Sequence, residues 1–249
     1  MAWIDRQVPE GDEIFYDHIG YFVPNLEIAG AQLEKLGFQV SAINIQYNEN
    51  EAGELIPTGT SNRLAKLNRG FIEVLAATGE SALADQLWAM LARYQALHVI
   101  ALTHPDMTRT ATRLSDAGID MQDAVNLRRK VMVDGTETLM EFTVARVKPG
   151  TFPEGRLQVL TCHTPENFWL LGDMDHANRA DTLTDLLICV EDVAEATARY
   201  ERFFGKAAEK MGGLETLDLA RGRFHFVTPD QAGAMLQGFD APTLPYPQS

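Results

Sequence analysis

Residues 17–26 read Asp17-His18-Ile19-Gly20-Tyr21-Phe22-Val23-Pro24-Asn25-Leu26, and the fold prediction rests on this stretch. Its first half is rich in aromatic and β-branched residues and is closed by Pro24-Asn25, which predicts a strand. Asn25 is then a suitable N-cap for a helix that has Leu26, Ala29, Leu33 and Leu36 on its apolar face and stops at Gly37. The stretch therefore predicts a strand that begins with an imidazole and leads into a short helix packed against it.

The same strand–helix pattern occurs twice more. The second copy has a strand at 97–103, a capping Asp106 and a closing Gly118, and the third has a strand at 184–190, a capping Asp192 and a closing Gly205. A spacing of roughly 80 to 90 residues is too long for a solenoid but suits a duplicated supersecondary module. Any α/β chain has several strand–helix units, but here the cap, the helix length and the stop coincide, which favours true repetition.

Antiparallel strands are predicted after each helix. After the first helix they span 38–47, 59–67 and 71–76, with a polar surface loop at 48–58 and a connecting helix at 81–96. Later hairpins turn at Asp134-Gly135 and Arg221-Gly222. The predicted fold class is α+β, with repeated βαβββ modules at 15–96 and 97–180 and a shorter βαββ-like third module at 181–240.

Composition narrows the functional classes. The chain has 249 residues and a net charge of −14, which argues against nucleic acid and against an anionic membrane as partners. No apolar run approaches the length of a membrane span, and the acidic segment from Met1 to Asp12 lacks the apolar core of a signal peptide. Cys162 and Cys189 lie in apolar runs, which predicts buried thiols and a cytoplasmic location.

One carboxylate stands out because it lies inside an apolar strand. Glu73 is flanked by Ile72 and Val74, and a buried carboxylate requires a cation, a metal or a hydrogen-bond network. It could be a metal ligand or general base, or it could form a salt bridge with Arg63 or Lys66 across the hairpin. The nucleotide-binding glycine motifs, the zinc-protease motif and the nucleophile elbow are all absent from the sequence.

Several short motifs together resemble one known superfamily. They are Asp17-His18-Ile19-Gly20, Leu36-Gly37-Phe38, Gly59-Thr60-Ser61-Asn62-Arg63, Phe71-Ile72-Glu73-Val74-Leu75, Val133-Asp134-Gly135-Thr136-Glu137, His163-Thr164-Pro165-Glu166 followed by Trp169, and His176-Ala177-Asn178. This pattern is similar to the vicinal-oxygen-chelate superfamily, and within it to the glyoxalase-like domain family. The resemblance covers about residues 15 to 190 and implies paired βαβββ modules whose curved mixed sheets form a cup.

The resemblance also implies a metal site. Superfamily ligands come from the first and last strands of a module, which correspond here to His18 and Glu73, then to His98 and Gln158, and in the third module to Asp185 and His225. Such a set would suit divalent Fe, Mn, Ni or Zn. Gln158 departs from the pattern because an amide replaces a carboxylate. A homodimer is a further implication, since superfamily members share sheets between chains.

The remaining candidate residues concern substrate and proton transfer. Asn62 and Arg63 are candidates for binding an anionic or carbonyl group at the rim, Trp169 for contacting an apolar substrate, and Glu73 or His163 for moving a proton. The predicted function is a metal-dependent isomerase or lyase acting on a small hydroxy-carbonyl substrate. The alternatives are a ring-cleaving Fe(II) dioxygenase, which needs two histidines and one carboxylate, and a metal-free protein that binds small ligands.

Overall fold

The computed structural model describes residues 6–50, 52–94, 96–240 and 244–248, so part of the predicted acidic lead-in, residues 1–5, lies outside them. The first module comprises β1 (Phe15–Phe22), α1 (Leu26–Lys35), β2 (Asn44–Glu49), β3 (Leu55–Lys66) and β4 (Phe71–Ala77), and α2 (Ala82–Leu91) follows it. The second comprises β5 (Leu97–Thr103), α3 (Met107–Asp116), β6 (Val125–Val133), β7 (Thr136–Arg146) and β8 (Arg156–Cys162), followed by α4 (Pro165–Phe168) and the short 3-10 turn η1 (Leu171–Asp173).

The third module is more complete than predicted. It comprises β9 (Asp185–Cys189), α5 (Val193–Phe204), β10 (Glu209–Met211), β11 (Leu214–Asp218) and β12 (Arg223–Val227), followed by α6 (Pro229–Met235) and β13 (Tyr246–Gln248). The three-residue β10 pairs with β11, so this module also has the order βαβββ. A strand this short has no alternating pattern long enough to be read from the sequence.

The helix starts that define the repeat are confirmed. The side chains of Asn25, Asp106 and Asp192 each accept a hydrogen bond from the backbone N–H three residues later, which satisfies a donor that the first helical turn leaves unpaired. Gly205 ends α5 with a φ of 65°, a left-handed conformation that glycine adopts without steric penalty.

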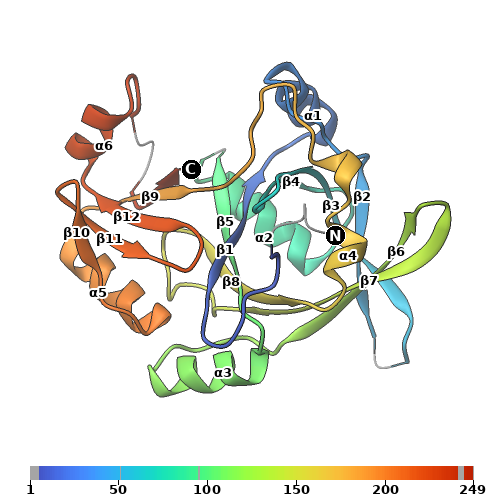
Figure 1. Ribbon diagram of the computed structural model, residues 1–249, viewed down its shortest axis with the longest axis horizontal. Helices are drawn as coiled ribbons and strands as arrows, with labels where there is room; N and C mark the ends of the chain where they lie inside the picture. The colour runs from blue at the N-terminus through green and yellow to red at the C-terminus, as the bar shows by residue number, and fades with distance from the viewer. Residues whose placement is uncertain (1–5, 51, 95, 241–243, 249) are drawn as a thin grey trace.

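The first two modules share one eight-stranded mixed sheet. Its order is β2-β3-β4-β1-β5-β8-β7-β6, with β1 and β5 antiparallel at the centre and each parallel to the last strand of its own module. The edge strands β2 and β6 contact each other, so the sheet curls into a cup (Figure 1). The chain is therefore an α+β protein with cupped mixed sheets, and the cup is formed by the first and second modules.

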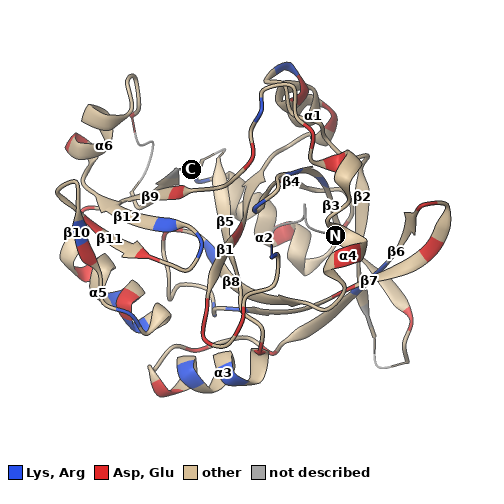
Figure 2. Ribbon diagram, viewed as in Figure 1, with Lys and Arg blue, Asp and Glu red and all other residues tan. Residues whose placement is uncertain are grey.

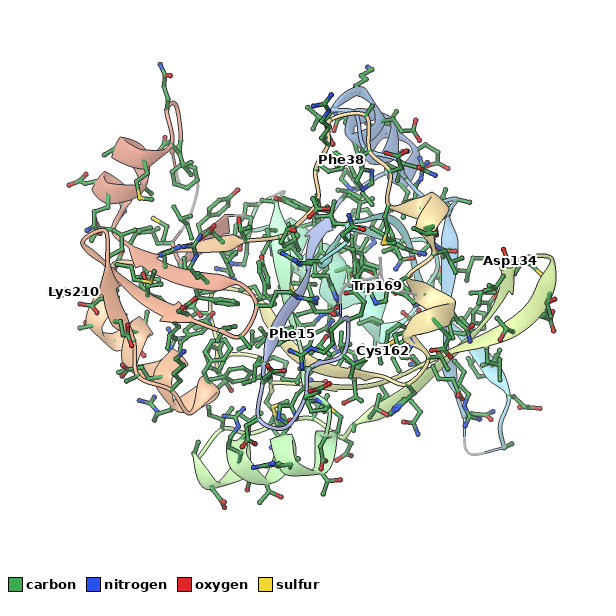
Figure 3. All side chains as sticks on the ribbon, viewed as in Figure 1. Phe15, Phe38, Asp134, Cys162, Trp169 and Lys210 are labelled. Atoms are coloured by element: carbon green, nitrogen blue, oxygen red, sulfur yellow. The ribbon has the colours of Figure 1, made fainter. Side chains whose placement is uncertain are left out.

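The third module packs on the outside of the cup. Its five strands form a separate sheet in the order β10-β11-β12-β9-β13, and α5 lies against β11 and β12 (Figure 1). Tyr16 at the start of β1 contacts Phe224 of β12 with ring centroids 5.3 Å apart. Figure 3 shows the extent of the molecule, with Lys210 of β10 on one side and Asp134 at the tip of the β6–β7 hairpin on the other.

The predicted surface loop at 48–58 is mostly strand. β2 continues to Glu49 and β3 begins at Leu55, and the short turn between them is held by the Asn50 side chain, which accepts from Glu54 N. Pro57 interrupts the sequence pattern of a strand. It pairs only with Tyr47 of β2 and has no partner in β4, so its missing N–H is tolerated. Across the described ranges, no helix is both long and apolar enough to cross a membrane.

Candidate functional site

The polar residues of the cup meet around a cavity of about 90 Å³ on the concave side of the central strands. The first module contributes His18, Gln46, Asn62 and Glu73, and the second contributes Arg129, Arg146, Arg156 and Gln158. Apolar side chains, among them Phe71, Leu160 and Phe168, complete the wall. The cavity thus lies between two halves that the chain brings together through the β1–β5 pairing.

A bulge in β1 presents His18 to the cavity. The register between β1 and β5 shifts between Tyr16 and His18, so Asp17 is the extra residue. Asp17 Oδ2 lies 2.6 Å from His18 Nδ1, and its Oδ1 accepts a 2.5 Å hydrogen bond from the Thr103 hydroxyl. Because the Asp17 carboxylate accepts a hydrogen bond from Nδ1–H, the other ring nitrogen of His18, Nε2, faces the cavity with its lone pair.

Asp17 remains ionised to low pH. Burial opposes its ionisation, but the hydrogen bond from His18, reinforced by Thr103 and Arg221, holds its pKa below the ordinary value of 3.8. His18 and Asp17 are 5 % and 4 % exposed, so the pair is shielded from water. From the sequence, a hydrogen bond between these two residues was the alternative to a functional role for His18. In the structure His18 both bonds Asp17 and lines the cavity.

Glu73 reaches the same cavity from β4. Its Oε1 accepts a 2.5 Å hydrogen bond from the Asn62 amide, and its Oε2 lies 4.0 Å from His18 Nε2. The alternative of a salt bridge across the hairpin does not occur, because Arg63 pairs with Glu34 and Lys66 with Asp173. Glu73 is 6 % exposed and is held by amide hydrogen bonds rather than neutralised by a close cation.

Gln158 occupies on β8 the place that Glu73 occupies on β4. Glu73 pairs with Gly20 of β1, and Gln158 pairs with Ala101 of β5. Gly20 and Ala101 occupy the same position in the first strands of the two modules. The Gln158 amide nitrogen lies 3.3 Å from His18 Nε2, and its carbonyl oxygen is buried with no hydrogen-bond partner in the described part of the chain. An amide oxygen that is buried without a partner is costly unless a ligand satisfies it.

His98 does not join this group, which corrects the prediction that it is a ligand. β1 and β5 are the first strands of the two modules, and they run antiparallel to each other. In this pairing His18 lies opposite Ala101 and Gly20 lies opposite Val99, so the residue of β5 that takes the place of His18 in β1 is Val99. The second irregularity in the β1–β5 register falls at His98, so His98 corresponds to Asp17. Its Nε2 bonds the Tyr94 carbonyl at 2.8 Å, and its ring stacks against Tyr94 and Phe22.

Three other predicted residues lie away from the cavity wall. Arg63 alternates with Asn62 on β3 and bonds Ser41 O and Glu34 on the outer side. His163 is exposed and bonds the Thr143 hydroxyl. Trp169 is buried in an apolar cluster beside the cup (Figure 3), where its ring packs on Phe168, which itself lines the cavity. In the third module, Asp185 and His225 bond each other at 2.8 Å, and neither lines the cavity.

The residues that sequence reasoning missed are three arginines. Arg129, Arg146 and Arg156 come from three neighbouring strands, β6, β7 and β8, and all line the cavity that holds Glu73. Burial lowers the pKa of each, and for Arg156 the nearby Arg146 adds to this and brings the pKa to about 10, whereas Glu73 acts in the opposite direction. The sequence feature that could have indicated them is an arginine in each of three strands of the second module.

The cavity contains donors of the kinds that hold divalent ions. His18 Nε2 and Glu73 Oε2 are separated by 4.0 Å, a span that two ligands at about 2.0–2.2 Å from one ion bridge only when they stand on nearly opposite sides of it. Gln158 has a buried, unpaired amide oxygen, and the Asp17 carboxylate orients His18 through the hydrogen bond at Nδ1. The third donor is an amide, and within the described ranges no three His, Cys, Asp or Glu side chains gather in a way that could hold a metal.

Comparisons with known proteins agree with this architecture. The model of a family described as "Glyoxalase-like domain" matches residues 16–204. A hypothetical protein from Staphylococcus aureus is similar in structure, with a TM-score of 0.63 and 11% identity, covering 86% of each chain. A triple mutant of 4-hydroxymandelate synthase from Streptomyces coelicolor gives 0.54 and 15%, covering 88% of this chain and 64% of that one. No curated protein matches the sequence. At these identities the structural likeness shows the fold alone.

Proposed function

Because the chain belongs to the glyoxalase-like domain family of the vicinal-oxygen-chelate superfamily, we propose that it is a divalent-metal-dependent enzyme that moves a proton on a small hydroxy-carbonyl substrate. The observation that carries the proposal is that His18, Glu73 and Gln158 line one small cavity of the cup. The reaction class is that of an isomerase or lyase, in which a base accepts a proton from the carbon next to a carbonyl.

The three converging side chains are the proposed metal ligands. His18 offers Nε2, Glu73 offers Oε2 and Gln158 offers its unpaired amide oxygen. A bound divalent ion of the Fe, Mn, Ni or Zn type would supply Lewis-acid stabilisation of negative charge on neighbouring substrate oxygens. A divalent ion, rather than an organic cofactor, is favoured by the donor types and by the small volume of the cavity.

Glu73 is the proposed general base. Its Oε1 is held by the Asn62 amide, and Oε2, the oxygen that would hold an ion in the resting protein, would accept a proton only when it does not ligate that ion. The apolar wall of Phe71, Leu160 and Phe168 limits water around this oxygen, so the proton that Glu73 accepts can be returned to the substrate rather than lost to solvent. His163 lies outside the cavity, which leaves Glu73 as the candidate for proton transfer.

The geometry gives less support to a ring-cleaving dioxygenase. That chemistry uses two imidazoles and one carboxylate around Fe(II). Among the described cavity residues there is one imidazole, His18, and the position equivalent to it in the second module is Val99. A metal-free binding protein is the remaining alternative, and the elemental measurement below decides between it and the enzyme.

The first test is elemental analysis of the purified protein after loading with Fe(II), Mn(II), Ni(II) or Zn(II). The wild type should hold one equivalent, and Glu73→Gln and His18→Ala should lose it. His98→Phe is the matched control, because it removes an imidazole that lies outside the cavity. A wild type that takes up none of the four metals would reject the enzyme as proposed and favour the metal-free binding protein.

The second test measures the chemistry. Hydroxyacetone is incubated with loaded protein in D2O, and exchange of its carbon-bound hydrogens is followed by NMR. Glu73→Gln should reduce the exchange rate at least about 100-fold, because this variant lacks the proposed base and one of the proposed metal ligands. Exchange that is equally fast in Glu73→Gln would show that another group accepts the proton.

A further inference from the structure

The cavity holds more positive charge than the protein neutralises. On the outer helices α3 and α5, basic residues lie among acidic ones (Figure 2), and the whole chain carries a net charge of −14. In the cup the balance is reversed, because Arg129, Arg146 and Arg156 line one small cavity in which Glu73 is the single carboxylate among the lining residues. Such a cluster of cations in an acidic protein indicates a negatively charged ligand.

The guanidinium groups of these arginines have no carboxylate partner among the described residues. Among the described residues, none of the three makes an ion pair within 4.0 Å, and the buried Nε atoms of Arg146 and Arg156 have no hydrogen-bond partner. The nearest stabilising contact of Arg156 is the face of Phe22, with the guanidinium carbon 5.4 Å from the ring centroid. Buried guanidinium groups normally pair with carboxylates or phosphates, so these donors are available to a ligand.

The position of the arginines fixes where the ligand's charge would lie. They project from β6, β7 and β8, whereas Glu73 and His18 project from β4 and β1 on the other half of the cup. An anionic group on the arginines would therefore place the adjoining carbon between the two halves, facing Glu73. The cavity volume of about 90 Å³ admits a small group such as a carboxylate with its neighbouring carbon.

A second, larger cavity lies beside the first. Arg146 and Arg156 also line this outer cavity of about 620 Å³, together with Arg93, Lys148 and the apolar Phe152. The charged residues around the arginine cluster are therefore basic on this side as well.

We propose that Arg129, Arg146 and Arg156 bind an oxyanion group of the substrate, a carboxylate or a phosphate, and that this group adjoins the carbon that faces Glu73. The substrate class is then a small acid that carries a hydroxyl and a hydrogen on the carbon next to the charged group, such as a 2-hydroxy acid. Only the assignment of that carbon as the reacting one rests on the proposed function, because anion binding needs neither metal nor catalysis.

The experiment measures anion binding to metal-free protein by ligand-observed NMR in a buffer without chloride. The probes are glycolate, inorganic phosphate and glycolamide, which has nearly the shape of glycolate but no charge. The variants are Arg146→Met and Arg156→Met, which keep the length of the side chain and remove its charge. Arg128→Met is the control, because Arg128 precedes Arg129 on β6, pairs with Glu141 and does not line the inner cavity.

Glycolate, phosphate or both should bind the wild type and the control, whereas glycolamide should not. Each cavity variant should weaken anion binding about tenfold or more, in line with the loss of a charge-assisted hydrogen bond. Preference for glycolate over phosphate assigns the carboxylate, and the reverse assigns the phosphate. Equal binding of glycolate and glycolamide, no binding of any anion, or an equal loss in Arg128→Met would overturn the proposal.

This design separates two kinds of failure. A protein that binds glycolate but takes up no metal would contradict the proposed enzyme and leave the arginine site standing. A protein that takes up metal but binds neither anion would contradict the arginine site alone. Folding of the variants is checked by their thermal midpoints, which should not fall, because removing a buried cation without a partner is neutral or stabilising.

Discussion

Gly20 and Glu73 are register partners in β1 and β4, and the absence of a side chain at Gly20 leaves room for the Glu73 carboxylate. A Cβ atom at Gly20 would lie 3.3 Å from Glu73 Oε2 and 2.8 Å from the Cβ of Val99. The second distance is shorter than side-chain atoms tolerate, so β1 and β5 can lie this close only with glycine at position 20.

Gly20→Ala adds only a methyl group, but it should lower both the stability of the protein and metal binding at the site. We expect a loss of about 1–3 kcal/mol of unfolding free energy from overpacking, together with loss of the metal that we propose to bind at Glu73. Chemical denaturation and elemental analysis measure the two effects. The double variant Gly20→Ala/Val99→Ala relieves the closest contact and should recover most of the stability; no recovery would show that the clash with Val99 is not the cause.

Asp17→Asn tests the orientation of His18. The amide is a weaker acceptor than the carboxylate for the hydrogen bond from His18 Nδ1. Metal affinity should therefore fall about 10- to 100-fold, as is usual when the group that hydrogen-bonds a histidine ligand is lost. A competition titration with a chelator measures the affinity. An unchanged affinity would mean that His18 keeps its orientation without Asp17.

The same residue predicts a pH dependence of stability. The pKa of Asp17 is lower in the folded protein than its ordinary value of 3.8, so the unfolded chain binds the proton more tightly. The stabilisation by ionised Asp17 is therefore fully present above pH 3.8 and is lost as the pH falls through the folded-state pKa. Urea unfolding should show wild type more stable than Asp17→Asn at pH 6, with a smaller difference at pH 3. A difference that grows towards low pH would contradict this assignment.

A buried ion pair links the third module to the cup. Glu154, which is fully buried, accepts two hydrogen bonds from Arg199 of α5, at 2.8 and 2.6 Å. Removing Arg199 leaves the Glu154 carboxylate buried without its cation, so Arg199→Ala should cost about 3–5 kcal/mol, whereas Glu154→Ala should cost less because Arg199 keeps its bonds to Glu195. A double-mutant cycle by denaturation should give a combined loss well below the sum. Strict additivity would indicate that the two charges do not interact.

The repeat and the first half of the site could be predicted from the sequence because both depend on local signals. Asn25, Asp106 and Asp192 mark the helix starts, and a carboxylate inside an apolar strand drew attention to Glu73. The assignment of His98 failed because side chains on a strand depend on its register. Two bulges in the β1–β5 pairing place Val99 at the position of His18, and a bulge leaves no mark in a single sequence.

In the second half of the site Gln158 was a sequence candidate, but the three arginines could not be predicted because their meeting with Glu73 depends on the closure of the sheet. Arg129 and Arg146 are far apart along the chain from Glu73, and they meet it only because β6, β7 and β8 curve round to face β4. The sequence also could not show which two of the three modules pair. That choice depends on the antiparallel contact between β1 and β5, two strands whose apolar patterns resemble that of β9.

The pairing of β1 with β5 has a consequence for how such a site can evolve. A cup assembled from two identical subunits must carry the same residues on both sides, so any change appears twice. In this chain the two sides are encoded separately, and they have diverged: one supplies His18, Asn62 and Glu73, and the other supplies Arg129, Arg146 and Arg156. Joining the halves in one polypeptide thus permits a division of labour, and on the functions proposed above one side would act on the ligand and the other would select it by charge.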